Sequence, residues 1–302
     1  MSQTTKSAVR HLEEIVGRDV GRHIEALVTA ARGGLWGAAT SIAAAETPHV
    51  AIITGFYIPY SEPPAAENDG PPGAASLAAA LVRAGVSVRL VTDEPCAPAV
   101  RAAAEAAGVG DVPLDTIPVD AGDAEIEAVL EAWDGAPNPV SHVVSIERVG
   151  PAADGRPRNA RGDDISGWTG PLDRLFTAPR TTIGIGDGGN ELGMGRLPPE
   201  VVADIAHGDE IACRVRCDHL IVCGVSNWGA WALIGALALV RADWHNALLS
   251  RLTMEQELEI LRATVENGPS VDGMLGKPAM SVDRLPWHDH AAILASVLNT
   301  AR

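Results

Sequence analysis

Residues 181–195 read TTIGIGDGGNELGMG, and this stretch joins a predicted strand to a glycine-rich turn. The segment TTIGIG is apolar on both faces, which is typical of a strand buried within a parallel sheet. Acidic and amide side chains then follow at once, with Asp187, Asn190 and Glu191 close together in the turn. Because ligands of open α/β sheets bind beyond the carboxyl ends of the strands, the sequence predicts a site at this turn.

Predicted strands and helices alternate on both sides of this stretch. The strands lie at 49–56, 86–93, 115–120, 140–147, 181–186 and 218–226. The helices lie at 5–32, 73–85, 97–108, 123–133, near 171–178, at 198–208, 228–241 and 253–267, and from about 288. This alternation predicts an α/β fold: a doubly wound, mostly parallel sheet with helices on both faces, preceded by an N-terminal helical extension. With no repeat or linker in the sequence, we interpret 1–302 as a single α/β domain.

Composition and charge limit the classes of partner. The net charge is −16 and the calculated pI is about 4.9, whereas nucleic-acid-binding proteins carry basic patches. An acidic surface also disfavours anionic membranes, and no apolar run approaches the roughly 18 residues that a membrane span needs. The N-terminus shows no targeting pattern. We therefore expect a cytoplasmic protein with a small-molecule amino-acid substrate and no nucleic-acid or membrane partner; a homo-oligomer is open.

Polar, glycine-rich segments follow four of the predicted strands at their carboxyl ends. They occupy 57–74, 148–164, 187–195 and 227–231, while connections at the opposite end, such as 108–114, are plain. Since the carboxyl ends of parallel strands lie at one edge of the sheet, these segments should meet. The candidate catalytic residues are the carboxylates within or directly before these segments: Asp69, Glu147, Asp187 and Glu191.

The glycines of the central turn formally match a dinucleotide-binding pattern. Gly184, Gly186 and Gly189 have the G-x-G-x-x-G spacing after a strand. Asp187 and Glu191 would repel a pyrophosphate, so the pattern favours a small ligand approached closely by backbone. The acids then serve an ammonium group, a metal or proton transfer, although Asp187 or Asn190 could instead simply cap the following helix.

No cofactor is required by these residues, but a divalent cation is compatible with them. Oxygen ligands suit Mg²⁺ or Mn²⁺, and Asp69, Asp187 and Glu191 could supply them. An acidic cluster that binds an ammonium group explains the same residues.

The predicted substrate-binding residues come from the same segments and from one later loop. They are Gly70, Arg148, Asn159, Arg161, Gly188, Gly189, Asn190, Ser226, Asn227 and Asp272. Arg148 is suited to bind a carboxylate of the substrate, and so are the backbone N–H groups at the predicted helix start, Ser226–Asn227. The long loop 148–168 is interpreted as a lid in which Asn159 and Arg161 meet a substrate carboxylate and Asp154 helps to hold the closed form; alternatively, its charges only pair with one another.

These motifs, in this order, resemble the D-glutamate cyclase-like family. The resemblance rests on NDGPPGA (68–74), SIERVGPAADG (145–155), GIGDGGNELGMG (184–195), SNWG (226–229), VDGMLG (271–276) and SVDRLPW (281–287), and it extends over roughly residues 10–298. The family usually has E-T-D-G where this chain has Asn68, and more often has Gly at the position of Arg284. Both differences leave open a substrate other than D-glutamate.

The resemblance implies a lyase of the hydro-lyase type. Its reaction would be the ATP-independent cyclisation of D-glutamate, or of a similar amino-dicarboxylate, to 5-oxo-D-proline and water. The chemistry needs a carboxylate base near the ammonium group and an acid of raised pKa near the γ-carboxylate. Two alternatives are an amidohydrolase that opens a lactam or cyclic amide, and a non-enzymatic amino-acid-binding module.

Overall fold

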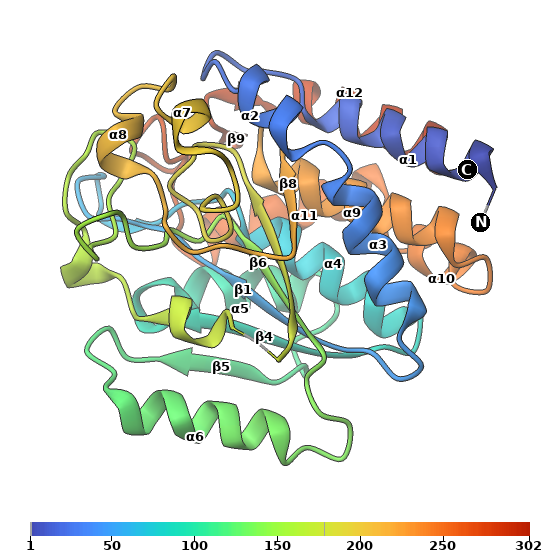
Figure 1. Cartoon of the computed structure of the whole chain (residues 1–302), viewed down its shortest axis with the longest axis horizontal. Helices are drawn as coiled ribbons and strands as arrows, with labels where there is room; N and C mark the ends of the chain where they lie inside the picture. Colours follow the sequence, from blue (N-terminus) through green and yellow to red (C-terminus); the bar gives the residue numbers. More distant parts are fainter. Residues whose placement is uncertain (1, 178) are drawn as a thin grey trace.

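A six-stranded parallel sheet forms the centre of the protein (Figure 1). The structure is a computed structural model that describes residues 2–177 and 179–302. The strands are β1 (His49–Thr54), β4 (Ser87–Asp93), β5 (Leu114–Ile117), β6 (His142–Ile146), β7 (Thr181–Gly186) and β8 (His219–Val222). They are arranged in the order β5-β4-β1-β6-β7-β8 with every pairing parallel. The chain therefore reverses its direction across the sheet between β1 and β6, where open α/β sheets bind ligands.

Helices cover both faces of this sheet, as predicted. They are α1 (Gln3–Val16), α2 (Glu25–Ala31), α3 (Gly34–Ala44), α4 (Pro71–Arg83), α5 (Ala97–Ala106), α6 (Asp123–Asp134), α7 (Pro199–Val202), α8 (Gly208–Ile211), α9 (Ser226–Val240), α10 (His245–Leu249), α11 (Met254–Glu266) and α12 (Trp287–Ala301). Alternate strand residues enter two cores: Val50 and Ile52 pack with α1, α3, α4, α5, α9, α11 and α12, whereas Ala51 and Ile53 pack with α2, α6, α7 and α8. The α/β prediction is confirmed.

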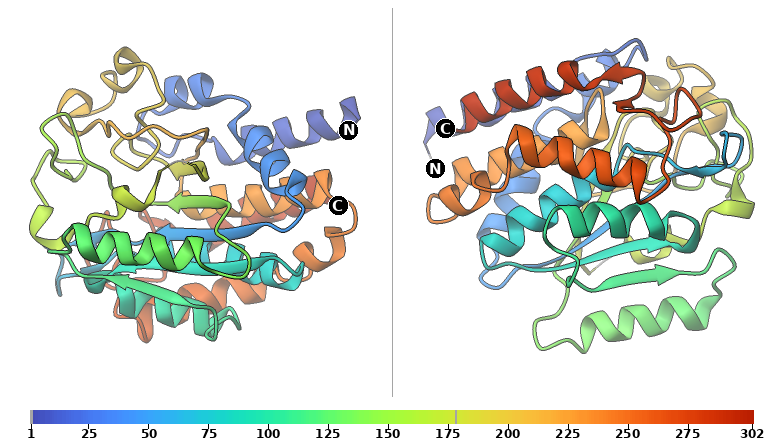
Figure 2. Two further views of the ribbon diagram at one scale, coloured as in Figure 1. Left: turned by 60° about the horizontal axis from the view of Figure 1, so that its bottom comes forward. Right: turned by 180° about the vertical axis from the view of Figure 1, so that it is seen from behind.

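Figures 1 and 2 show how the molecule is oriented around the sheet. The helices α1 and α12 lie side by side, and the two termini lie at the same end of the molecule. In Figure 1 the arrow of β5 points left, toward the irregular segments that gather around α7 and α8. The carboxyl ends of the parallel strands, and with them the candidate site, lie at that end.

The long N-terminal helix predicted over 5–32 is wrong. The structure has α1, a loop, α2, and then the additional helix α3. The break occurs because the Asp19 carboxylate accepts the backbone N–H groups of Gly21, Arg22 and Ile24, and Gly21 takes a left-handed φ of 100°. These local hydrogen bonds compete with helical ones.

Several later boundaries also differ from the predictions. The helix expected at 198–208 is two single turns, α7 and α8, and His207 between them has a φ of 57°. Near 171–178 only a 3₁₀ turn forms (Leu172–Leu175), and position 178 lies outside the described residues. The loop 269–287 contains a small hairpin, β9 (Ser281–Val282) and β10 (Leu285–Pro286), and the segment after β1 contains another, β2 (Tyr57–Ile58) with β3 (Ala65–Ala66).

Within the described residues, none of the helices combines the length and the apolar character needed to span a bilayer. The longest of them have 15 residues, as in α9 and α12.

Candidate active site

The segments that follow β1, β6, β7 and β8 meet at the carboxyl edge of the sheet. Asp69 precedes α4, Glu147 follows β6, Asp187 follows β7, and Ser226 opens α9 after β8. Because these four strands are neighbours in the order β1-β6-β7-β8, the edge brings their ends together. The convergence predicted from the sequence is confirmed.

Hydrogen bonds tie Asp69 to the first turn of α9. The two oxygens of its carboxylate accept the backbone N–H groups of Ser226 and Asn227, both at 2.8 Å. In return, the Asn227 Oδ1 accepts the N–H groups of Gly70 at 3.1 Å and Gly73 at 2.7 Å. Asp69 therefore occupies the helix end that we predicted to bind a substrate carboxylate.

Glu147 is held in an unusual backbone conformation beside this contact. Its φ is 46°, which is uncommon for a residue with a side chain and recurs at functional sites. The Ser226 hydroxyl donates to its Oε2 at 2.5 Å. Gly70, with a φ of 99°, must be glycine, because a Cβ would lie 2.9 Å from the Cβ of Glu147.

Glu191 organises the glycine-rich turn that opened the sequence. Its carboxylate accepts the backbone N–H groups of Asp187 at 3.0 Å, Gly188 at 2.6 Å and Gly189 at 2.7 Å. The turn is thus folded around an acidic side chain of its own. The Glu191 carboxylate accepts the N–H groups that would otherwise attract a phosphate. Asn190 points the other way and donates from Nδ2 to the carbonyl of Arg158 at 2.9 Å.

An arginine that the sequence analysis missed reaches into this cluster. Arg22, in the loop between α1 and α2, pairs through Nη1 with Asp187 and through Nη2 with Asp283, the latter at 2.7 Å. Asp283 lies in the β9–β10 turn with a φ of 54°. One guanidinium therefore joins the N-terminal loop, the glycine-rich turn and the C-terminal hairpin.

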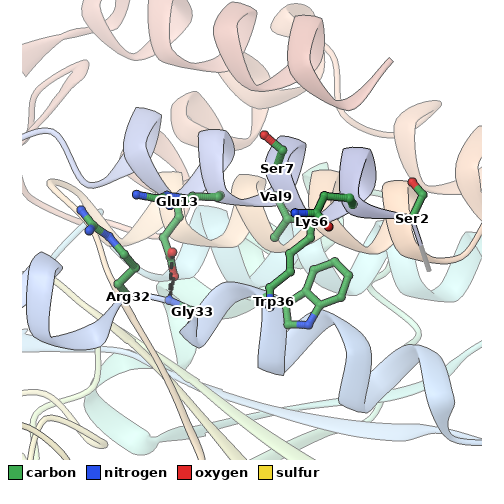
Figure 3. A pocket seen from close by; sticks show the side chains of 10 residues that line it. Ser2, Lys6, Ser7, Val9, Glu13, Arg32, Gly33 and Trp36 are labelled. Atoms are coloured by element: carbon green, nitrogen blue, oxygen red, sulfur yellow. Dashed lines mark hydrogen bonds between the residues drawn. The ribbon is translucent and has the colours of Figure 1, made fainter.

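The carboxylates of the cluster are buried. Glu67, Asp69, Glu147, Asp187, Glu191, Asp272 and Asp283 are each no more than 9% exposed. A cavity of about 640 Å³ lies elsewhere, between α1 and the start of α3 and lined by Lys6, Arg10 and Trp36 (Figure 3). No carboxylate of the cluster lines that cavity.

Burial and mutual repulsion raise the pKa values of these acids. The pKa of Asp69 is raised to about 7 because burial and then the charge of Asp283 outweigh the N–H groups of Ser226 and Asn227 and the Arg22 guanidinium, which oppose the shift. For Glu147, burial and then the charges of Asp187 and Glu191 all raise the pKa well above its usual value. Burial also raises the pKa of Asp187, but there Arg22 opposes it.

Two groups of carboxylates are close enough to share one cation. Ligand oxygens of Asp69, Asp187 and Asp283 lie within 4.8 Å of one another, and so do those of Glu147, Asp187 and Glu191. The predicted set of Asp69, Asp187 and Glu191 is divided between these two groups, with Asp187 common to both.

The sequence of the chain matches a known family over most of its length. Residues 12–298 match the model of the family described as D-glutamate cyclase-like, C-terminal. The chain is also 34% identical over 332 aligned residues to the human protein named D-glutamate cyclase, mitochondrial. The chain belongs to the D-glutamate cyclase-like family. The alignment covers 99% of this chain and 52% of the human protein, so the chain spans about half the length of that relative.

All of the clustered residues, including Arg22 and Asp283, lie within the 12–298 range that matches the D-glutamate cyclase-like family. Neither of these two residues stands out in the sequence. Arg22 belongs to no motif, and Asp283 lies in a hairpin rather than after a strand of the main sheet. Glu67 and Asn68, which precede Asp69 in the chain, are also buried, and neither was predicted as a site residue.

Other predicted binding residues lie outside the cluster or have partners of their own. Arg148 is buried, and it donates to the Asp93 carboxylate at 2.6 Å and to the carbonyl groups of Gly55 and Gly170. Asp272 accepts the Ser281 hydroxyl and the N–H groups of its own loop. Both residues therefore hold segments of this family's fold together, and their contact with a substrate stays a prediction.

The loop 148–168 is cross-linked largely by its own charges. Arg158 pairs with Asp154 at 2.6 Å, and Arg156 pairs with Asp164 at 3.0 Å. Asn159 bonds within the loop to Asp163, and Arg161 is exposed. This internal pairing matches the interpretation in which the charges of the loop only pair with one another. The hydrogen bond from Asn190 links the loop to the glycine-rich turn.

Proposed function

We propose that this protein is a lyase that cyclises D-glutamate, or a similar amino-dicarboxylate, to 5-oxo-D-proline and water without ATP. In this reaction the amine nitrogen forms a bond to the γ-carboxyl carbon, and the bond between that carbon and one oxygen breaks. The two protons lost from nitrogen leave with that oxygen as water. Family membership supports the reaction class, and the buried carboxylate cluster is the observation that carries it to these residues.

The cluster offers carboxyl groups in different electrostatic surroundings side by side. Every neighbour that influences Glu147 most strongly raises its pKa, whereas Asp187 has a guanidinium against it. Environments that separate the pKa values of two nearby acids assign them opposite roles. Glu147 is therefore the proposed acid, which keeps the γ-carboxyl group of the substrate neutral, and Asp187 is the proposed base for the ammonium group.

The backbone N–H groups of the glycine-rich turn and of the start of α9 would suit an oxyanion, but they have other partners. The N–H groups of Gly188 and Gly189 bond to Glu191, and those of Ser226 and Asn227 bond to Asp69. Negative charge that develops on the reacting carbonyl is thus stabilised in our proposal by a protonated carboxyl group. The Ser226 hydroxyl, bonded to Glu147, fixes the position of that group.

A divalent cation remains a proposal for the same cluster. The all-oxygen donor set of Asp69, Asp187 and Asp283 fits Mg²⁺ or Mn²⁺, which would polarise a carboxylate when bound. However, Arg22 already forms ion pairs with Asp187 and Asp283 and compensates their charges. The alternative occupant of the remaining acidic positions is the substrate's ammonium group.

Incubation with D-glutamate, L-glutamate and 5-oxo-D-proline, followed by mass spectrometry, separates the candidate functions. Loss of one water from D-glutamate supports the cyclase, and gain of water by 5-oxo-D-proline alone supports the amidohydrolase. Thermal stabilisation without turnover supports a binding module. A parallel reaction in excess EDTA tests the cation, because unchanged turnover by protein in which no metal is detected would eliminate an essential ion.

A further inference from the structure

The loop that carries Arg22 is built to hold this side chain against the sheet. Gly21 and His23, on either side of it, have left-handed φ values of 100° and 63°. The Asp19 carboxylate fixes the loop by accepting the N–H groups of Gly21, Arg22 and Ile24. The side chain of Ile24 is fully buried, so the segment is anchored at its C-terminal end.

The Arg22 side chain is partly exposed, but its Nη1 atom is buried against the acidic cluster. Its side chain is 22% exposed, while those of its partners Asp187 and Asp283 are 3% and 4% exposed. A guanidinium has five N–H donors in a planar fork, and the two ion pairs are made through its terminal nitrogens Nη1 and Nη2. Donors therefore remain for a further acceptor while the two aspartates hold the group in place.

The charge of the site requires such a cation for a substrate that is itself a dicarboxylate. Glu67, Asp69 and Glu191 also lie around the Arg22–Asp187–Asp283 contact, and each of them repels a second carboxylate whenever it is ionised. Arg148, the arginine predicted for this role, is directed to Asp93 instead. Within the part of the chain that the structure describes, Arg22 is the arginine that forms ion pairs with the cluster.

We propose that Arg22 binds a carboxylate of the substrate and so selects dicarboxylates over their monoamides. The proposal deepens the function proposed above and rests on it for the identity of the substrate. It makes the N-terminal loop part of the binding site. Arginine suits this role because its fork binds a carboxylate through two parallel hydrogen bonds.

Glutarate tests the assignment, because it carries both carboxylates but lacks the amine and cannot cyclise. We expect calorimetry to detect glutarate binding to the 302-residue chain, and Arg22→Met to weaken it by about 10- to 100-fold, the usual loss for a charged hydrogen bond. Arg22→Lys should bind glutarate with intermediate affinity. Arg18→Met is the matched control, since Arg18 is an exposed arginine of the same loop. Where D-glutamate is turned over, Arg22→Met should raise KM for it by a similar factor.

The outcomes for Arg22 and for the reaction are separable. Arg22-dependent glutarate binding without D-glutamate turnover would contradict the cyclase and retain the role of Arg22. Turnover of D-glutamate with equal KM in wild type and Arg22→Met would retain the cyclase and contradict the role of Arg22. Glutarate that binds neither protein, or both equally, overturns the proposal; if Arg22→Met does not fold, equal binding by wild type and Arg22→Lys overturns it.

Discussion

Asp187 contacts Arg22 and lies in both groups of carboxylates that could share a cation. Replacement by Asn keeps the shape and the turn while it removes the charge. We expect Asp187→Asn to lower kcat by about 10²- to 10⁴-fold, the range of general acid–base catalysis, with little change in the melting temperature.

The matched control for this change is Asp209→Asn, which removes the charge of an exposed aspartate. It should keep the activity of the wild type. Near-normal kcat in purified Asp187→Asn would take Asp187 out of the mechanism.

At the scale of single residues, the sequence predicted those acids that follow strands of the main sheet. Asp69, Glu147 and Asp187 meet because parallel strands bring their carboxyl ends to one edge. Arg22 and Asp283 could not be predicted in this way. They come from a loop between helices and from a small hairpin, and only the folded chain places them against that edge.

At the scale of elements, the loop 148–168 carries the most direct consequence for function. Asn190 of the glycine-rich turn donates a hydrogen bond to the carbonyl of Arg158 in this loop. Within the loop, Asn159 donates a hydrogen bond to Asp163. If the loop closes over the buried site, saturating 5-oxo-D-proline should protect residues 148–168 from hydrogen exchange, whereas α6 should not change. Asn159→Ala should then reduce turnover more than stability.

Unchanged exchange in this loop, together with full activity of both Asn159→Ala and Arg161→Ala, would show that it is scaffold. The side-chain pairs Arg158–Asp154 and Arg156–Asp164 would then serve only to stabilise the loop.

The packing of α11 against α4 and α9 includes a buried acid. Glu257 accepts the Ser76 hydroxyl at 2.6 Å and the Trp231 indole N–H at 2.7 Å through one oxygen. Burial raises the pKa of Glu257 from 4.5 to about 7, although both hydrogen bonds oppose the shift. As the pH rises, the unfolded state therefore releases the Glu257 proton before the folded state does. The stabilisation that protonated Glu257 gives the folded state is complete below about pH 4.5 and is lost as the pH rises toward about 7.

The variant Glu257→Gln isolates this effect. Relative to it, the free energy of unfolding of the wild type should fall by about 3 kcal/mol between pH 4.5 and pH 7, as measured by urea denaturation. A difference between the two proteins that is constant with pH would contradict the buried, protonated state of Glu257.

The periodic pattern of the elements was sufficient for the sheet and for most of its helices. It failed where short-range hydrogen bonds compete with the helix, as at Asp19, and where left-handed residues such as His207 divide a helical segment. The small hairpins β2–β3 and β9–β10 have strands of two residues, too short for an alternating pattern to be visible.

At the scale of the whole molecule, the N-terminal extension is part of the main core. Residues Val9 and Leu35 of α1 and α3 enter the same core as α9 and α12, and Figure 1 shows α1 alongside α12. This packing fixes the loop that presents Arg22. The site is thus assembled from both ends of the chain around the carboxyl edge of the sheet.

The reaction of purified protein with D-glutamate tests the central claim most directly. We expect mass spectrometry to show 5-oxo-D-proline accumulating without ATP as D-glutamate is consumed, at a rate that Asp187→Asn lowers by about 10²-fold or more. If the wild type leaves D-glutamate unchanged and does not form it from 5-oxo-D-proline, the proposed function is contradicted.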